Sequence, residues 1–134
     1  MKKAISLIMC IVIVLSTLGI CAFAETKNSP RFTNVGEINT VFNIDSNGNA
    51  RVTVSYDGYS AMTHATIKIK IQKQFLFFFW TDVIEWTDES TERYYAKTFT
   101  TPVDGGTYKA IVEYTIRGTA GEPDVITDEI QRTY

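Results

Sequence analysis

The chain has 134 residues, enough for one domain with a modest core, and 13 basic against 15 acidic residues give a formal net charge of −2. This slight acidic excess argues against binding to nucleic acid and against electrostatic attachment to anionic lipid. Both cysteines, Cys10 and Cys21, lie near the N-terminus. The rest of the chain therefore has no disulfide, and its core must supply the stability alone.

The first residues have the pattern of a secretory signal peptide. Basic Met1–Lys3 precedes an apolar run over Ala4–Leu15, and Ala22-Phe23-Ala24 offers a small-x-small cleavage site. We expect residues 1–24 to be removed, so that 134 minus 24 leaves 110 residues, secreted or associated with the cell envelope. Two of the 13 basic residues leave with this segment, and the remaining 11 against 15 acids give a net charge near −4.

Two other interpretations of the N-terminal segment remain open. Ala4–Ala24 is uncharged and long enough to span a bilayer if it is not cleaved. Leu18–Cys21 also resembles a bacterial lipidation motif, although Ile20 stands where a small residue is required.

Beyond a polar lead-in over residues 25–34, which we expect to be flexible, the chain divides into short runs of alternating polarity bounded by turn residues. The clearest run places Ile67, Ile69 and Ile71 on one face, and Asn47-Gly48 is the strongest hairpin signal. The runs predict strands over residues 37–45, 50–56, 64–74, 79–86, 93–100, 107–117 and 125–133. Strands at this spacing are typical of an antiparallel β-sandwich, here over residues 35–134. A single helical turn is expected over residues 87–92.

The stretch Asp104-Gly105-Gly106-Thr107-Tyr108-Lys109-Ala110 matches the tyrosine-corner pattern of immunoglobulin domains, with Ala110 in place of the cysteine. In such a corner the tyrosine hydroxyl bonds back to the backbone, and a glycine permits the close approach. Because the motif opens the sixth of seven strands, we expect Asp104, Gly106 and Tyr108 to form the corner of an immunoglobulin-like sandwich. An ordinary turn is the alternative. We expect Ala110 to pack against Val52 or Val54.

With these motifs, the chain resembles small secreted, single-domain immunoglobulin-like proteins of Gram-positive, Clostridia-type bacteria, most of which have no assigned function. The resemblance rests on Ala65–Lys73, Trp80–Trp86 and Gly105–Tyr108, and it covers about two-thirds of the chain beyond residue 24. It implies an exported immunoglobulin-like domain rather than an activity. In such proteins the first two segments flank a polar, glycine-rich hairpin tip, whereas this chain has Gln74–Phe79 at that place.

No pattern indicates catalysis or a cofactor. His64 is the single histidine, and the sequence has no nucleophile elbow and no glycine-rich phosphate or dinucleotide motif. A run of acidic residues is interpreted as a solvated edge, with weak divalent-cation binding or glycoside hydrolysis as alternatives; it comprises Asp82, Glu85, Asp88, Glu89 and Glu92. We therefore expect no enzyme, no catalytic or metal-binding residue and no cofactor.

A calcium-loop interpretation fails for the segment that begins at Asp45. Asp45, Asn47 and Asn49 have the spacing at which such a loop starts. However, Ala50 stands where the loop needs glycine, and Tyr56 where it needs a bidentate acid. The segment is predicted to be a turn.

The most unusual feature is the apolar run Phe75-Leu76-Phe77-Phe78-Phe79, followed by Trp80. If the strands on either side pair as a hairpin, the run lies at or near its tip, where burial is hardest. Each phenylalanine carries about 150–250 Å² of surface, so the run can exceed the ~300–600 Å² apolar patch normal for a monomer.

Three outcomes for this run are open: a tip folded back under Tyr59, Met62 or Tyr94-Tyr95, an exposed contact surface, or an aggregation-prone segment. Trp80 and Trp86, six residues apart, are expected to share a face of their strand.

Together these features predict a secreted, non-catalytic binding module of unknown ligand. The candidate contact residues are Phe75, Leu76, Phe77, Phe78, Phe79 and Trp80. The expected partner is a protein, a glycan or a membrane surface, and not a nucleic acid. We expect a monomer, with self-association through the apolar hairpin as the alternative. The alternative function is a small secreted membrane-active toxin or bacteriocin-like effector that inserts the same tip.

Overall fold

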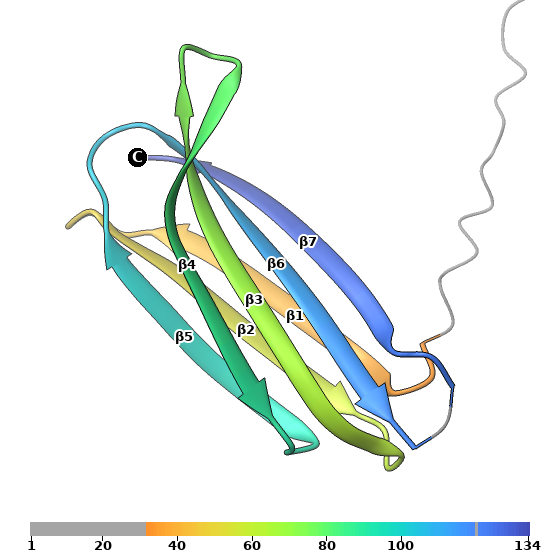
Figure 1. Ribbon diagram of the computed structural model, residues 1–134. Helices are drawn as coiled ribbons and strands as arrows, with labels where there is room; N and C mark the ends of the chain where they lie inside the picture. The colour runs from red at the N-terminus through yellow and green to blue at the C-terminus, as the bar shows by residue number, and fades with distance from the viewer. Residues whose placement is uncertain (1–31, 120) are drawn as a thin grey trace, which may run out of the picture. The chain divides into compact units, whose positions relative to one another are not determined.

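The computed structural model describes residues 32–119 and 121–134, which fold into two antiparallel sheets (Figure 1). The described strands are β1 (Val35–Ile44), β2 (Asn49–Gly58), β3 (Met62–Phe75), β4 (Phe79–Ser90), β5 (Tyr94–Pro102), β6 (Thr107–Gly118) and β7 (Asp124–Thr133). One sheet has the order β1-β2-β5 and the other β4-β3-β6-β7. The all-β antiparallel sandwich is thus confirmed. The expected signal peptide, residues 1–24, and the lead-in up to residue 31 lie outside the described residues.

The core lies between the two sheets and follows the alternation of the sequence. In β3, Ala65, Ile67, Ile69 and Ile71 are fully buried, because every second side chain of a strand points to the same face. The other buried apolar residues of this core are Val35, Phe42, Ala50, Val52, Val54, Tyr56, Met62, Tyr108, Ala110, Val112, Tyr114 and Ile116. Ala110, Val52 and Val54 are thus members of one buried cluster.

Strand β4 extends further than its apolar pattern indicates. The helical turn expected over residues 87–92 is wrong, because β4 continues to Ser90, which pairs with Ala65 of β3. The acidic residue Asp88 points toward the second sheet, where its carboxylate accepts hydrogen bonds from the Tyr95 hydroxyl and from Lys97 Nζ, the latter at 2.6 Å. These partners on the other sheet explain why Asp88 lies in a strand where the sequence predicts a helical turn.

The start of β1 is anchored by a carboxylate that is distant in the sequence. Asp124, which begins β7, is 9% exposed and accepts hydrogen bonds from the backbone N–H groups of Thr33, Asn34 and Val35 at 3.1, 2.6 and 3.2 Å. Asn34 is fully buried, and its Nδ2 donates to the carbonyl of Glu122 at 3.2 Å. The end of the segment that the sequence predicts to be flexible is therefore fixed.

Gly118 permits this arrangement. A Cβ on Gly118 would lie 2.0 Å from Oδ1 of Asn34, closer than any side chain tolerates. That oxygen has no hydrogen-bond partner among the described residues. It therefore packs against Gly118 without a hydrogen bond, in the space that a side chain at position 118 would fill.

The motif predicted to be a tyrosine corner has the hydrogen bond typical of one. Tyr108 is 1% exposed, and its hydroxyl donates to the backbone carbonyl of Asp104 at 2.9 Å. Gly106 has φ 148°, and a Cβ there would meet Cε of Lys73 at 2.8 Å. Asp104, Gly106 and Tyr108 therefore lie together at the start of β6.

Asp104 makes the corner sensitive to acid. The hydrogen bond from Lys73, followed by that from the Tyr108 hydroxyl, lowers the pKa of the Asp104 carboxyl from 3.8 to about 2. Because the folded-state pKa is depressed, this contribution to stability is present above pH 3.8 and is lost as the pH falls toward about 2. We expect the denaturation midpoint of Asp104→Asn to fall less steeply than that of the parent over this range. Equal slopes in acid denaturation curves, or a carboxyl NMR titration of Asp104 near its usual pKa, would contradict the assignment.

Candidate contact hairpin

The apolar run forms the tip of the hairpin between β3 and β4. Phe75 ends β3 and pairs with Phe79, the first residue of β4, and Leu76, Phe77 and Phe78 form the turn between them. We call residues 75–79 the apolar tip. The exposed fractions of its five side chains, in order, are 60, 62, 85, 84 and 64%. The tip is therefore on the surface.

The tip cannot be covered by the residues that the sequence suggested. Met62 begins β3, whereas the tip follows the end of the same 14-residue strand. At about 3.3 Å per residue this is a separation of about 40 Å. Tyr59 donates its backbone N–H to Asn34, and Tyr94 pairs with Asp57, so both lie at the Met62 end of the domain. The folded-back interpretation is wrong for this reason.

The hairpin extends beyond its neighbouring strand. Pairing between β3 and β6 ends at Lys73 and Tyr108, so Gln74 to Trp80 form a two-stranded projection past the end of the sheet. Figure 1 shows this projection in green, clear of the loops at the same end of the sandwich. No neighbouring strand pairs with it among the described residues.

The backbone of the turn is one that its side chains disfavour. Leu76 and Phe77 have φ values of 48° and 65°. Two consecutive positive φ values are those of the central residues of a type I′ turn, here within a loop of three residues, and Asn-Gly is strongly preferred at such positions. Each costs a residue with a Cβ roughly 1–2 kcal/mol. The Gln74 amide supports the turn by donating to the Phe77 carbonyl at 2.8 Å. Neither folding nor turn chemistry explains the choice of residues here.

A β-bulge separates the projection from the rest of the hairpin. Ile71 pairs with Ile84 and Gln72 with Asp82, which leaves Val83 as an extra residue in β4. The extra residue reverses the alternation of β4 from that point. The expectation that Trp80 and Trp86 share a face is therefore wrong.

The two tryptophans contact different surfaces. Trp86 lies on the inner face, with its ring centroid 5.5 Å from that of Phe99 in β5. Trp80 lies on the outer face, where Nζ of Lys109 is 4.7 Å from its ring centroid, a cation–π geometry. Trp80 thus belongs to the base of the projection and not to the core.

Charged groups at the base of the projection are paired. Lys73 bonds the Asp104 carboxylate, Lys109 Nζ lies 3.6 Å from Glu129, and Lys70 Nζ lies 3.4 Å from both Asp82 and Glu85. The Gln72 amide also donates to Asp82 at 2.6 Å. The pKa of the Asp82 carboxyl is lowered by this hydrogen bond and by the charge of Lys70, and the pKa of Lys70 is raised by Asp82.

The other residues singled out in the sequence are dispersed. Asp82 and Glu85 face outward while Asp88 faces β5, so the acidic run is divided between the two faces of β4. His64 lies in β3, with Nε2 3.4 Å from the Thr66 hydroxyl. Asp45 accepts bonds from the backbone of Asn47 and Asn49, as in a turn. No group of three potential metal ligands occurs within the described residues.

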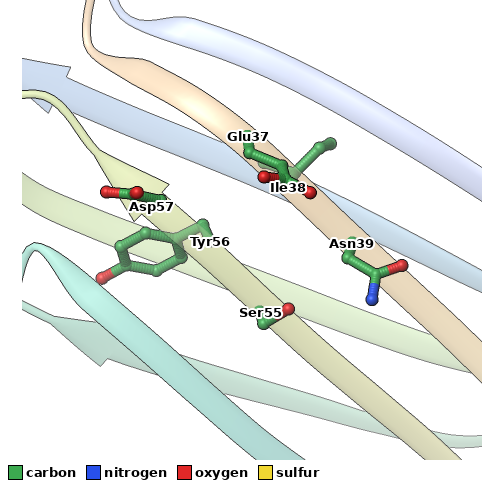
Figure 2. Close-up of a pocket in the computed structure, with 6 residues that line it drawn as sticks. All are labelled: Glu37, Ile38, Asn39, Ser55, Tyr56 and Asp57. Carbon is green, nitrogen blue, oxygen red and sulfur yellow. The ribbon is translucent and has the colours of Figure 1, made fainter.

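A shallow hollow lies elsewhere, on the outer face of β1 and β2. It has a volume of about 230 Å³ and is lined by Glu37, Ile38, Asn39, Ser55, Tyr56 and Asp57 (Figure 2). Glu37 pairs with Asp57 and Asn39 with Ser55, which places two carboxylates opposite each other. Figure 2 shows Ser55, Tyr56 and Asp57 on β2 and Glu37, Ile38 and Asn39 on β1. The lining includes the hydroxyl groups of Ser55 and Tyr56 and no histidine.

Together the fold and the exposed tip at residues 75–79 define the protein as a β-sandwich that displays an apolar hairpin tip. No family model, curated protein or solved structure matches the chain. Among the described residues, no helix is present that has the length and apolar character needed to cross a membrane.

Proposed function

We propose that the protein is an exported, non-catalytic binding module, built on an immunoglobulin-like domain, whose contact element is the apolar tip. The observation that carries this proposal is the exposure of all five tip side chains, from 60 to 85%. Monomeric proteins seldom leave so large a contiguous apolar surface in water unless it contacts something. The immunoglobulin-like class is supported by the Tyr108–Asp104 corner, and export by the N-terminal sequence.

The tip has enough surface to drive a contact. Burying one exposed phenylalanine side chain is worth roughly 1.5–3 kcal/mol. Phe77 and Phe78 are more than four-fifths exposed, so each of these two can contribute more than any other residue of the tip. The strained backbone at Leu76 and Phe77 agrees with a segment selected for what it contacts, since such strain is often found at functional sites.

Replacing Phe77 and Phe78 by serine tests this proposal. We expect the free energy of unfolding to change by less than about 1 kcal/mol, because both side chains are already in water. We expect retention on a phenyl-substituted matrix to fall sharply, since the apolar surface is lost. Val125→Ser is the matched control: Val125 is 60% exposed at the opposite end of the domain, and its loss should leave retention nearly unchanged. A drop in stability of several kcal/mol would show that the tip is part of the core and would refute the proposal.

A further inference from the structure

We infer that the surface contacted by the apolar tip is the interfacial region of a lipid bilayer, entered to a shallow depth. This inference rests on the proposed function and names the partner of the same hairpin. Four features of the tip carry it: its apolar character on every side, its reach, the groups at its base, and the state of its backbone.

The tip is apolar in all directions. Phe75 and Phe79 are opposite each other as the last pair of the hairpin, and the three residues between them form its end. The least exposed of the five side chains is still 60% exposed, so neither face of the hairpin is turned inward. A protein groove of the kind that binds a helix contacts mainly one face of the bound element. Acyl chains surround an inserted tip from every side, and this matches the even distribution of apolar surface.

The reach of the tip corresponds to the depth of interfacial binding. The last residue of β3 paired with β6 is Lys73, and Gln74, Phe75 and Leu76 lead from there to the end of the hairpin. Three residues at ~3.3 Å each extend about 10 Å. Apolar groups of proteins that lie in the membrane interface are buried by about 5–10 Å. The sandwich itself then stays in water.

The groups at the base follow the order found across a membrane interface. Phenylalanine and leucine occupy the end of the hairpin, and Trp80 lies next to them. The ammonium group of Lys109 lies over the Trp80 ring, and Lys73 is the last residue of β3 that pairs with β6. Tryptophan rings concentrate at the headgroup level, and lysines extend their ammonium groups to water. Trp80 is half-buried against Lys109, so its ring is held at the position of the headgroups.

Charge pairing at the base indicates the kind of lipid. Lys73, Lys109 and Lys70 each have a carboxylate partner, respectively Asp104, Glu129 and Asp82. The base therefore presents no unpaired lysine cluster of the kind that recognises anionic lipid. A zwitterionic surface such as phosphatidylcholine suffices, and salt should have little effect on binding.

The backbone of the turn limits the depth. Peptide groups that lose water in the hydrocarbon region need internal partners. The Gln74 amide supplies one to the Phe77 carbonyl, but a turn of three residues has too few hydrogen bonds to enter the bilayer core. The tip therefore stays at the boundary between headgroups and acyl chains and leaves the bilayer intact.

The test uses the full-length chain in a Trp86→Phe background, so that Trp80 is the only tryptophan. The probe is a vesicle of phosphatidylcholine brominated near the top of its acyl chains. We expect a blue shift and quenching of Trp80 fluorescence, little change with added phosphatidylglycerol or salt, and retention of an entrapped dye. The Phe77→Ser/Phe78→Ser variant should bind at least tenfold more weakly, and Val125→Ser as the parent does. Every variant has the same N-terminal segment, so a contribution from that segment is common to all.

Three results would overturn the inference. Absence of Trp80 quenching excludes the bilayer as partner. If the parent is still retained on the phenyl matrix in a tip-dependent way, the contact role of the hairpin survives and the partner is a protein; if it is not, both proposals fail. Binding that is equal in the parent and the double variant assigns the contact to another segment. Tip-dependent dye release indicates deep insertion, as in a membrane-active effector, and contradicts the shallow position.

Discussion

Replacing Asp124 by alanine is expected to lower the free energy of unfolding by about 3 kcal/mol. One buried carboxylate accepts three backbone N–H groups, from Thr33, Asn34 and Val35. Hydrogen bonds to a charged group are worth about 1.5–3 kcal/mol, and a buried donor left without a partner costs about 1–3 kcal/mol. The substitution also releases the start of β1 from the start of β7, which are otherwise held together across 89 positions or more of sequence.

Denaturant unfolding monitored by far-ultraviolet circular dichroism measures this effect. Glu122→Ala is the matched control: Glu122 is an exposed acid two positions away, and its loss should change stability by less than about 0.5 kcal/mol. Asp124→Asn keeps an acceptor oxygen and should fall between the two. A loss below about 1 kcal/mol for Asp124→Ala would mean that water replaces the carboxylate, and that the anchor contributes little.

The double substitution Leu76→Asn/Phe77→Gly is expected to raise the free energy of unfolding by about 1–2 kcal/mol while it weakens the apolar contact. Both residues have positive φ values, which cost a side chain with a Cβ roughly 1–2 kcal/mol each and cost glycine almost nothing. Asn-Gly is the preferred pair for such a turn. Stability and contact then change in opposite directions, which is the signature of a residue retained for binding rather than for folding.

Thermal and denaturant unfolding measure the gain, and retention on the phenyl matrix measures the loss. Phe78→Ser is the control, because Phe78 is equally exposed but is not among the residues with positive φ. It should reduce retention with no gain in stability. If the Asn-Gly variant is less stable than the parent, the side chains of Leu76 and Phe77 make stabilising contacts that the exposure does not reveal.

Most of the fold could be predicted from the sequence because each strand repeats one simple pattern. In β3 the isoleucines at every second position indicate one buried face, and the structure buries all three. Boundaries were less certain where the pattern is weak. Asp88 is an acid on an inward position, and only its partners in β5, Tyr95 and Lys97, explain why the strand continues through it.

Less of the candidate site could be predicted. The position of the apolar run at a hairpin tip follows from the two strands that flank it. Its exposure depends on whether residues distant in sequence, such as Tyr59 and Tyr94, lie near enough to cover it, and only the fold determines this. The bulge at Val83 has no signal in the sequence, since an extra residue is defined only by the partner strand. The anchor between Asn34 and Asp124 joins residues 90 positions apart, and neither residue is part of a local motif. Pairs of this kind are determined by topology.

The bulge at Val83 also affects how copies of the protein can meet. Strand β4 is the outer strand of its sheet, and a free strand edge is a template for cross-β stacking between molecules. A straight β4 of 12 residues beside five exposed apolar side chains would be well suited to start a fibril. Because Val83 interrupts the spacing of the backbone hydrogen-bonding groups, an added strand can match them on only one side of the bulge. Val83 therefore limits how far a second molecule can extend the sheet from the edge of β4 when two apolar tips meet.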